Sequence, residues 1–177
     1  IKCYDLAECK TSSIGDYLNN VLSMDNDEKI IYITDSNQYK GYMLFAFENG
    51  KIAKITMSSY ETKTMRKKLI NAYCDKTKLV SAMYIPKDID IILVRDTDKA
   101  MLLNTELIPE KHTKSTAGVN VYTLKKNSKL TKILKKDKFV SENIEYYRST
   151  KIPGTGHFIN DTDKDSNNFP KQLNIFD

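Results

Sequence analysis

Basic residues gather in three polar loops of this sequence, and side chains of this kind can bind a polyanion. The cations concerned are Lys10, Lys63, Arg66, Lys67, Lys68, Lys111 and Lys114. Lys and Arg bind phosphate oxygens and release counterions, while neighbouring Ser, Thr and backbone N–H groups donate hydrogen bonds to the same oxygens. A run of charge is also typical of an ordinary solvated loop, so the charge alone leaves both interpretations open.

A second basic cluster lies where the last strand-like segment gives way to the C-terminal stretch. Its members are Lys125, Lys126, Lys129, Lys132, Lys135, Lys136 and Lys138. We expect Lys125 and Lys126 to extend the phosphate-binding surface. Alternatively, the cluster keeps a terminal strand from pairing with other chains. The sequence contains no pattern typical of a helix that reads bases, so contact independent of base sequence is predicted.

Residue types that support catalysis lack the context that catalysis requires. His112 and His157 are the two histidines, and neither has a Ser or Cys nearby in a recognised nucleophile motif. Asp88 and Asp98 belong to carboxylates that flank strand-like runs, where turn formation explains them better than acid–base chemistry. The Gly-Thr-Gly at 154–156 matches neither phosphate-binding loop motif. We therefore expect no catalytic residue and no metal site in this chain.

Length and charge narrow the class of protein further. The chain has 177 residues, 29% of them charged, and a formal net charge of +5. This length suffices for one ordinary core or a few small repeat units, and the basic excess favours a polyanionic partner. No apolar run approaches the roughly 18 residues of a membrane-spanning helix, and the opening residues do not resemble a signal peptide. We expect a cytoplasmic protein without a membrane partner.

The elements that position the basic loops recur at a spacing of about 50 residues. A strand-like segment at 29–33 has counterparts at 78–83 and 129–134. Units of this length that contain several short strands predict an all-β, propeller-like arrangement of blades rather than a helical solenoid.

Two β-hairpins are predicted within this repeat. The apolar run at 42–47 ends at an Asn-Gly dipeptide, and strand-like alternation resumes at 51–55, which is a strong hairpin signal. The run at 90–94 precedes a polar turn, and a second apolar run follows at 100–104. The basic loops follow hairpins at one phase of the repeat, so we expect them to project from one edge and form a band of positive charge.

We predict blades over 1–134 and a separate C-terminal stretch. Within 1–134, the units are 1–24 (the end of one unit), 28–74, 78–124 and a last strand at 129–134. Residues 135–177 form a basic and then polar tail, which we expect to be partly disordered, above all from about Asp161. Isolated apolar residues of this tail are expected to pack back on the last unit, namely Ile144, Tyr146, Tyr147, Ile152 and Phe158. Because the sequence lacks an initiating Met and opens on a strand-like run, we expect a piece of a longer polypeptide.

Several short sequence segments resemble the C-terminal domain of the A subunit of bacterial DNA gyrase and topoisomerase IV, in a form associated with Gram-positive anaerobes. They lie at 47–55, 58–64, 66–69 and 117–121, and the resemblance runs from Ile1 to about Phe158. It implies a β-pinwheel, here about two to three blades of four-stranded antiparallel sheets with exchanged strands, whose basic outer rim bends or wraps duplex DNA.

The resemblance also implies partners and a parent enzyme. The partners would be duplex DNA, the ATPase-bearing B subunit of the enzyme and the remainder of its A subunit, with the enzyme located at the bacterial nucleoid. The parent would be an ATP-dependent type II topoisomerase that uses ATP and Mg²⁺, whereas this piece would hold no cofactor and catalyse nothing. A Gly- and Arg-rich motif associated with gyrase-type wrapping is absent from this sequence, so gyrase and topoisomerase IV both stay open. The other interpretation is a protein-interaction propeller that binds an acidic partner.

Overall fold

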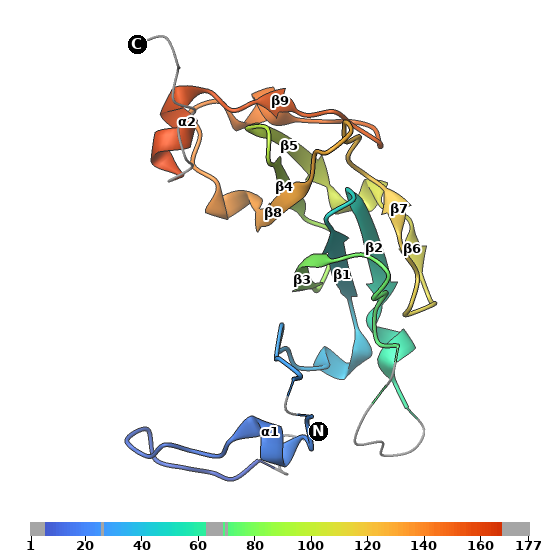
Figure 1. Cartoon of the computed structure of the whole chain (residues 1–177), viewed down its shortest axis with the longest axis vertical. Helices are drawn as coiled ribbons and strands as arrows, with labels where there is room; N and C mark the ends of the chain where they lie inside the picture. The colour runs from blue at the N-terminus through green and yellow to red at the C-terminus, as the bar shows by residue number, and fades with distance from the viewer. Residues whose placement is uncertain (1–5, 26, 63–68, 70, 168–177) are drawn as a thin grey trace.

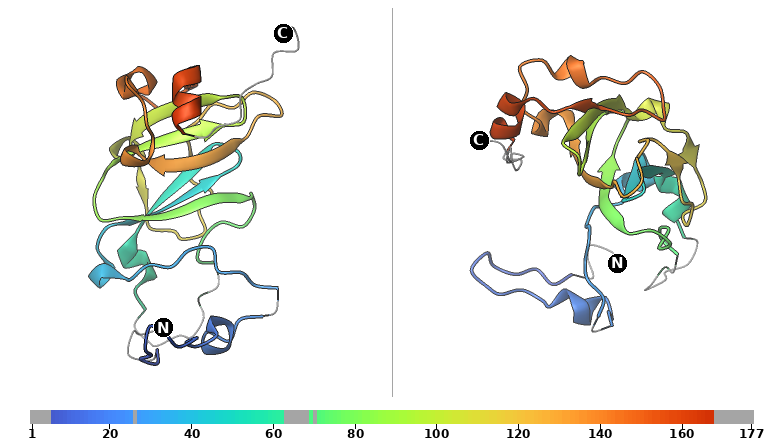
Figure 2. Two further views of the ribbon diagram at one scale, coloured as in Figure 1. Left: turned by 90° about the vertical axis from the view of Figure 1, so that its left-hand side faces the viewer. Right: turned by 45° about the horizontal axis from the view of Figure 1, so that its top comes forward.

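Two β-sheets make up most of the described part of the chain. The structure is a computed structural model, and it describes residues 6–25, 27–62, 69 and 71–167. One sheet, here sheet A, contains five strands, and sheet B contains four. Figure 1 shows the two sheets following one another along the long axis of the molecule, and Figure 2 shows the same arrangement from two further sides. The prediction of a mostly β, blade-like fold is confirmed.

Sheet A is built on the first predicted hairpin. Strands β1 (Tyr42–Phe47) and β2 (Lys51–Thr56) are antiparallel neighbours, and β3 (Leu79–Ile85) pairs with the other side of β1. Two short strands cover the free edge of β2, namely β6 (Glu110–Lys111), which is parallel to it, and β7 (Val119–Asn120), which is antiparallel.

Sheet B repeats this plan around the second predicted hairpin. Strands β4 (Asp90–Arg95) and β5 (Lys99–Asn104) form the hairpin, β8 (Leu130–Lys135) pairs with β4, and β9 (His157–Phe158) pairs with β5. Both hairpins predicted from the sequence are therefore confirmed.

The turn of the first hairpin shows why its glycine is needed. Gly50 has a φ of +76°, in the left-handed region that favours glycine, and a side chain at this position would overlap the backbone carbonyl of Tyr122. The backbone N–H groups of Val121 and Tyr122 both donate to the Gly50 carbonyl, at 3.1 and 3.0 Å. The Asn-Gly turn thus closes the hairpin and also receives the chain that returns from sheet B.

Outer strands are exchanged between successive stretches of chain. Strand β3 falls in the predicted unit 78–124 but completes sheet A, and β6 and β7 return from that unit to the edge of β2. The sheets consequently differ from the contiguous units 28–74 and 78–124 that the repeat suggested, because each hairpin takes its outer strand from the chain that follows it.

The strand expected at 29–33 does not form. This segment carries no assigned strand, and its apolar side chains are exposed. It lies between the short helix α1 (Leu18–Val21) and the 3-10 turn η2 (Asn37–Tyr39). The prediction fails because a strand needs a partner, and no described residue pairs with this segment.

Apolar side chains of both sheets meet in one central core. Leu44 and Ile52 of sheet A cluster with Ile91, Leu93 and Met101 of sheet B, and each has at most 1% of its surface exposed. Because neighbouring strand residues point to opposite faces, the alternate residues form two further clusters on the outer faces of the sheets.

The outer face of sheet B is covered by the C-terminal segment. Phe139, Tyr147 and Ile159 are buried there against Ile92 and Leu102. The segment contains the 3-10 turns η5 (Lys136–Lys138) and η6 (Ile144–Tyr147) and the helix α2 (Asp161–Ser166). Two other 3-10 turns, η3 (Met57–Tyr60) and η4 (Thr105–Leu107), follow the hairpins.

The stretch expected to be loose from Asp161 is instead helical as far as Ser166. Asp163 and Lys164 are buried in it. The Tyr147 hydroxyl donates to Asp163 Oδ2 at 2.6 Å, and Lys164 Nζ lies 3.3 Å from Asp98 Oδ2. These partners offset the cost of burying the charges of Asp163 and Lys164. Because the partners lie in other elements, the sequence of this segment shows no apolar face that would predict the helix. Residues 168–177 lie outside the described residues.

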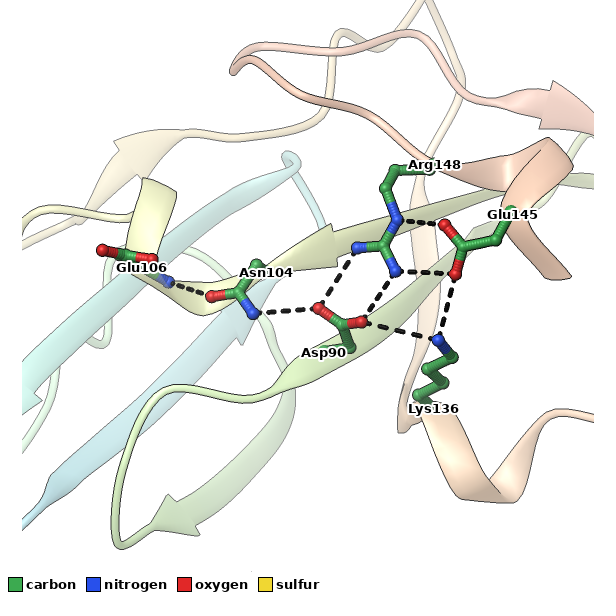
Figure 3. A network of polar contacts seen from close by, with 6 residues as sticks. All are labelled: Asp90, Asn104, Glu106, Lys136, Glu145 and Arg148. Atoms are coloured by element: carbon green, nitrogen blue, oxygen red, sulfur yellow. Dashed lines mark hydrogen bonds and ion pairs between the residues drawn. The ribbon is translucent and has the colours of Figure 1, made fainter.

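A network of ion pairs fastens this segment to sheet B, and we call it the C-terminal clasp (Figure 3). Arg148 donates to both oxygens of Asp90, at 2.8 and 3.2 Å, and also donates to Glu145. Lys136 Nζ lies 3.0 Å from Glu145 Oε1 and 3.7 Å from Asp90 Oδ2, and Asn104 donates to Asp90 at 2.9 Å. The clasp therefore joins β4, η5 and η6.

Candidate nucleic-acid interface

One of the predicted basic loops is held at both ends by the edge of sheet A. Strand β6 enters it and β7 leaves it, and both pair with β2. At the exit, Gly118 has a φ of +74°, and a side chain there would overlap the backbone of Ile52. This close approach fixes the loop between 112 and 117 on a rigid strand, so the positions of its cations are defined by the sheet.

This loop lies beside the start of a second predicted basic loop. Thr56 Oγ1 lies 3.1 Å from His112 Nδ1 and 2.9 Å from Ser59 Oγ. The Lys114 ammonium lies 5.9 Å from the centre of the Tyr60 ring, within the range of a cation–π contact. The structure thus brings the loop of Lys114 together with η3, from which the loop of Lys63 continues.

Tyr60 is a fixed support for this junction. Its hydroxyl donates to the carbonyl oxygen of Ala72 at 2.8 Å, and burial raises the pKa of the phenol above its usual value. The hydroxyl therefore stays protonated at neutral pH, and the ring presents its face to Lys114.

The lysines of this loop have no ion-pair partner among the described residues. Lys111 is exposed and Lys114 is half-buried, and neither pairs with a carboxylate of any described residue. Other lysines are paired, for example Lys78 with Glu48 at 2.9 Å. Because an ammonium without a carboxylate partner keeps its charge, Lys111 and Lys114 can bind an external anion.

Lys54 differs from Lys111 and Lys114, because its ammonium is buried and paired within the protein. It is 4% exposed, and its ammonium lies 2.6 Å from Asp88 Oδ1 and 3.2 Å from the Thr105 carbonyl oxygen. It also lies 4.5 Å from the centre of the Tyr42 ring. Lys54 thereby joins sheet A to the connection between β3 and β4 and to η4, and it is not available to a ligand.

Lys125 and Lys126 form a separate basic patch at the turns of both hairpins. Both are exposed, and neither forms an ion pair with the described acidic residues. The turn that carries them is held by Asp96, which accepts hydrogen bonds from Ser128 Oγ at 2.7 Å and from the Lys129 N–H at 2.9 Å. This turn follows the segment that contacts Gly50 at the start of β2, whereas His112 contacts Thr56 at the end of β2. At ~3.3 Å per strand residue, the two ends of β2 are roughly 17 Å apart.

Lys10, the one remaining predicted cation among the described residues, lies apart from these patches. Lys10 is exposed, and its carbonyl accepts hydrogen bonds from Ser13 N at 2.9 Å and from Ser13 Oγ at 2.7 Å in a local turn. Figure 1 shows this N-terminal segment extending away from both sheets. Lys63, Arg66, Lys67 and Lys68 lie outside the described residues. Their part in a single basic band therefore stays a prediction.

No binding role was predicted from the sequence for His112, Thr56 or Ser59 as individual residues. In the structure they lie at the junction of the two loops. The hydroxyls and the imidazole can hydrogen-bond phosphate oxygens beside the ammonium of Lys114. Their only sequence signal was the polar, hydroxyl-rich character of the two loops.

The described residues contain no group of His, Cys, Asp and Glu side chains arranged to hold a metal ion. Within the same residues, no helix has the length and apolar character required to cross a membrane. What the described surface offers is a set of cations and hydrogen-bond donors on a rigid β scaffold.

Two hairpin-based sheets with exchanged outer strands define the fold as a β-pinwheel. Solved structures that share it include the C-terminal domain of DNA topoisomerase IV, with a TM-score of 0.61 at 22% identity, over 75% of this chain and 42% of that one. The DNA gyrase A C-terminal domain gives 0.58 at 21% identity, over 80% and 52%. The E. coli ParC C-terminal domain gives 0.55 at 10% identity, over 84% and 67%.

Curated sequences agree with this fold, although no family model matches the chain. The A subunit of DNA gyrase from Borrelia hermsii is 25% identical over 136 residues, which are 76% of this chain and 17% of that protein. The A subunit of DNA topoisomerase 4 from Staphylococcus aureus is 24% identical over 128 residues, 71% of this chain and 16% of that protein. The homologues and structural neighbours of this chain are thus gyrase A and topoisomerase IV A proteins and their C-terminal domains. The chain spans about a sixth of the length of the curated relatives it matches, and the Gram-positive anaerobe form stays a prediction.

Proposed function

We propose that this chain binds and bends duplex DNA independently of base sequence, as the C-terminal β-pinwheel domain of a type IIA topoisomerase A subunit. The observation that carries the proposal is the loop of Lys111 and Lys114. Its cations are unpaired among the described residues, and β2 fixes it beside the hydroxyls of η3 and Thr56. The resemblance to gyrase A and topoisomerase IV A sequences supports a DNA-binding role for such a surface.

The placing of the two basic patches suits a duplex. They adjoin opposite ends of β2, and the length of that strand, roughly 17 Å, exceeds the ~12 Å width of the major groove. A duplex that touches both patches therefore places phosphates from both sides of a groove against the protein. Bending a short duplex toward such a surface costs on the order of 1–6 kcal/mol, which distributed phosphate contacts offset.

The proposed parent enzyme is inferred from the gyrase A and topoisomerase IV A relatives of this chain. In the parent enzyme, DNA cleavage would come from the remainder of the A subunit, whereas ATP hydrolysis with Mg²⁺ would come from a B subunit that bears the ATPase. The present residues would contribute DNA contact without a cofactor and without catalysis. The enzyme would act on DNA topology in the bacterial cytoplasm, at the nucleoid, with no membrane partner. Both gyrase and topoisomerase IV fit this assignment.

A salt titration tests the proposal. Binding of a fluorescently labelled duplex is measured by anisotropy at several salt concentrations, with two duplexes of unrelated base sequence. The expected result is similar affinity for both duplexes and a linear fall of log K with log salt concentration, because bound phosphates release counterions. No binding at low salt would refute the proposal. Strong binding of an acidic protein with none to DNA would instead support the protein-interaction propeller.

A further inference from the structure

Arg95, the last residue of β4, is a buried cation that has no carboxylate partner among the described residues. It is only 5% exposed, and no described Asp or Glu forms an ion pair with it. Arg148 shows the usual arrangement, since it binds the carboxylates of Asp90 and Glu145. Because burying a charge costs free energy unless the charge is paired, Arg95 calls for an anion that the described part of the protein does not supply.

The equivalent position in sheet A carries an apolar residue. In both sheets the pairing between the hairpin and its outer strand shifts directly before this residue, at Phe47 in sheet A and at Arg95 in sheet B. Phe47 is 1% exposed and packs in an apolar cluster. Packing at this position of the hairpin therefore needs no charge, and the guanidinium of Arg95 requires another explanation.

The guanidinium of Arg95 reaches the surface although most of the side chain is buried. Its Nε donates to Thr97 Oγ1 and its Nη1 donates to the Thr123 carbonyl oxygen at 3.3 Å, and both threonines are exposed. The centre of the Tyr122 ring lies 5.8 Å from Cζ. Nη2 has no acceptor among the described residues, and it is not one of their buried unpartnered atoms, so it contacts solvent. Nη2 can therefore donate to an external acceptor.

The surroundings of Arg95 favour an anionic acceptor. Thr123 begins the turn at 123–129, which carries the exposed Lys125 and Lys126, and neither lysine forms an ion pair with a described acidic residue. Three carboxylates also occupy this end of the hairpins, and each has partners of its own, namely Asp96 with Ser128 and Lys129, Glu48 with Lys78, and Asp98 with Lys164. The cations of the turn and of Arg95 thus remain available to an external anion.

We propose that Arg95 is the anchor of a phosphate-binding site at the hairpin-turn end of sheet B, with Lys125 and Lys126 as its outer cations. Nη2 donates to a phosphate oxygen, while the bonds to Thr97 and Thr123 hold the guanidinium in a fixed orientation. The ligand class is a phosphate group, and a backbone phosphate of duplex DNA is its source. That source rests on the proposed function, whereas the site itself does not.

A phosphate titration of the unaltered chain tests the site directly. The guanidinium N–H resonances are followed by NMR while inorganic phosphate replaces chloride at constant pH and ionic strength. The expected result is a saturable shift of the Arg95 resonances and no shift of those of Arg148, which carboxylates already occupy. An Arg95 signal that stays in place, or that moves no more than that of Arg148, would overturn the site. Because a purely structural Arg95 would not respond to phosphate, this result separates the two roles.

Duplex binding by Arg95→Phe tests the source of the phosphate. The variant introduces the residue that sheet A has at this position, and far-UV circular dichroism and urea denaturation check its fold. It should bind a duplex about tenfold more weakly and lower the slope of log K against log salt by ~0.9, because one phosphate contact is lost. Lys78→Ala, which removes a cation already paired with Glu48, should change both values far less.

The two experiments fail in different ways. If the original chain binds no duplex, the proposed function is wrong, and the phosphate titration still decides whether the site exists. If the Arg95 resonances respond to phosphate but Arg95→Phe binds the duplex like the original chain, DNA is refuted as the source and free phosphate is the ligand. If Arg95→Phe does not fold, the phosphate titration decides, since it needs no substitution.

Discussion

Replacing Arg148 by Ala should loosen the C-terminal clasp by about 2 kcal/mol. A hydrogen bond to a charged group contributes ~1.5–3 kcal/mol when its partners are held and partly desolvated. The Arg148 and Asp90 side chains are 29% and 20% exposed, which favours the lower part of this range for their two bonds. Asp90 also keeps Asn104 at 2.9 Å and Lys136 at 3.7 Å after the substitution, so its charge is not left alone.

Urea denaturation measures the predicted loss, with Lys138→Ala as the matched control. Lys138 is an exposed cation of the same segment and forms no ion pair with a described acidic residue, so its removal should change stability by less than ~0.5 kcal/mol. A double-mutant cycle of Arg148→Ala with Asp90→Asn should give a coupling of at least ~1 kcal/mol. If Arg148→Ala has no larger effect than Lys138→Ala, the clasp does not stabilise the fold as argued.

Three further predictions concern ionisation and buried polar groups. Hydrogen bonds from Arg148 hold the pKa of Asp90 below its usual range and that of Glu145 at about 2, so the clasp should be intact above a pH of ~4 and be lost as pH falls toward 2. Acid titration of the unfolding free energy checks this, and a clasp contribution that increases below pH 4 would contradict it. Asp88→Ala leaves the ammonium of Lys54 buried without its carboxylate, so the free energy of unfolding measured in urea should fall by about 3 kcal/mol. A loss under ~1 kcal/mol would mean that water solvates the ammonium. The Tyr122 hydroxyl is buried with no hydrogen-bond partner among the described residues. Replacement by Phe should therefore raise the free energy of unfolding by up to ~1 kcal/mol, whereas a clear decrease in the urea midpoint would mean that the hydroxyl has a partner.

Local signals in the sequence were sufficient to predict the hairpins. The apolar runs on either side of the turn at Gly50 specify β1 and β2 without reference to the rest of the chain. Pairing between distant segments was not predictable in this way. That β3 joins β1 follows from tertiary packing of the exchanged strands. Residues 29–33 have a similar strand-like pattern but pair with no described strand, so the pattern alone does not determine pairing.

For the candidate interface, the sequence predicted which loops are basic but not which of the lysines are free to bind a ligand. In the sequence, Lys54 and Lys111 are both cations near the repeat's strands and loops, yet one is buried on Asp88 and the other is exposed and unpaired. Which lysines neutralise internal acids is decided by three-dimensional neighbours. For the same reason, α2 was missed, since its stability comes from partners of Asp163 and Lys164 in other elements.

The most direct test of DNA binding compares two double substitutions that remove the same charge. Lys111→Ala with Lys114→Ala takes away the unpaired loop cations, whereas Lys78→Ala with Lys129→Ala takes away cations already paired with Glu48. Each phosphate contact contributes ~0.9 to the slope of log K against log salt, so the loop variant should flatten the slope by about 1.8 and the control by far less. Equal slopes in the two variants would contradict the assignment of this loop as the DNA-binding surface.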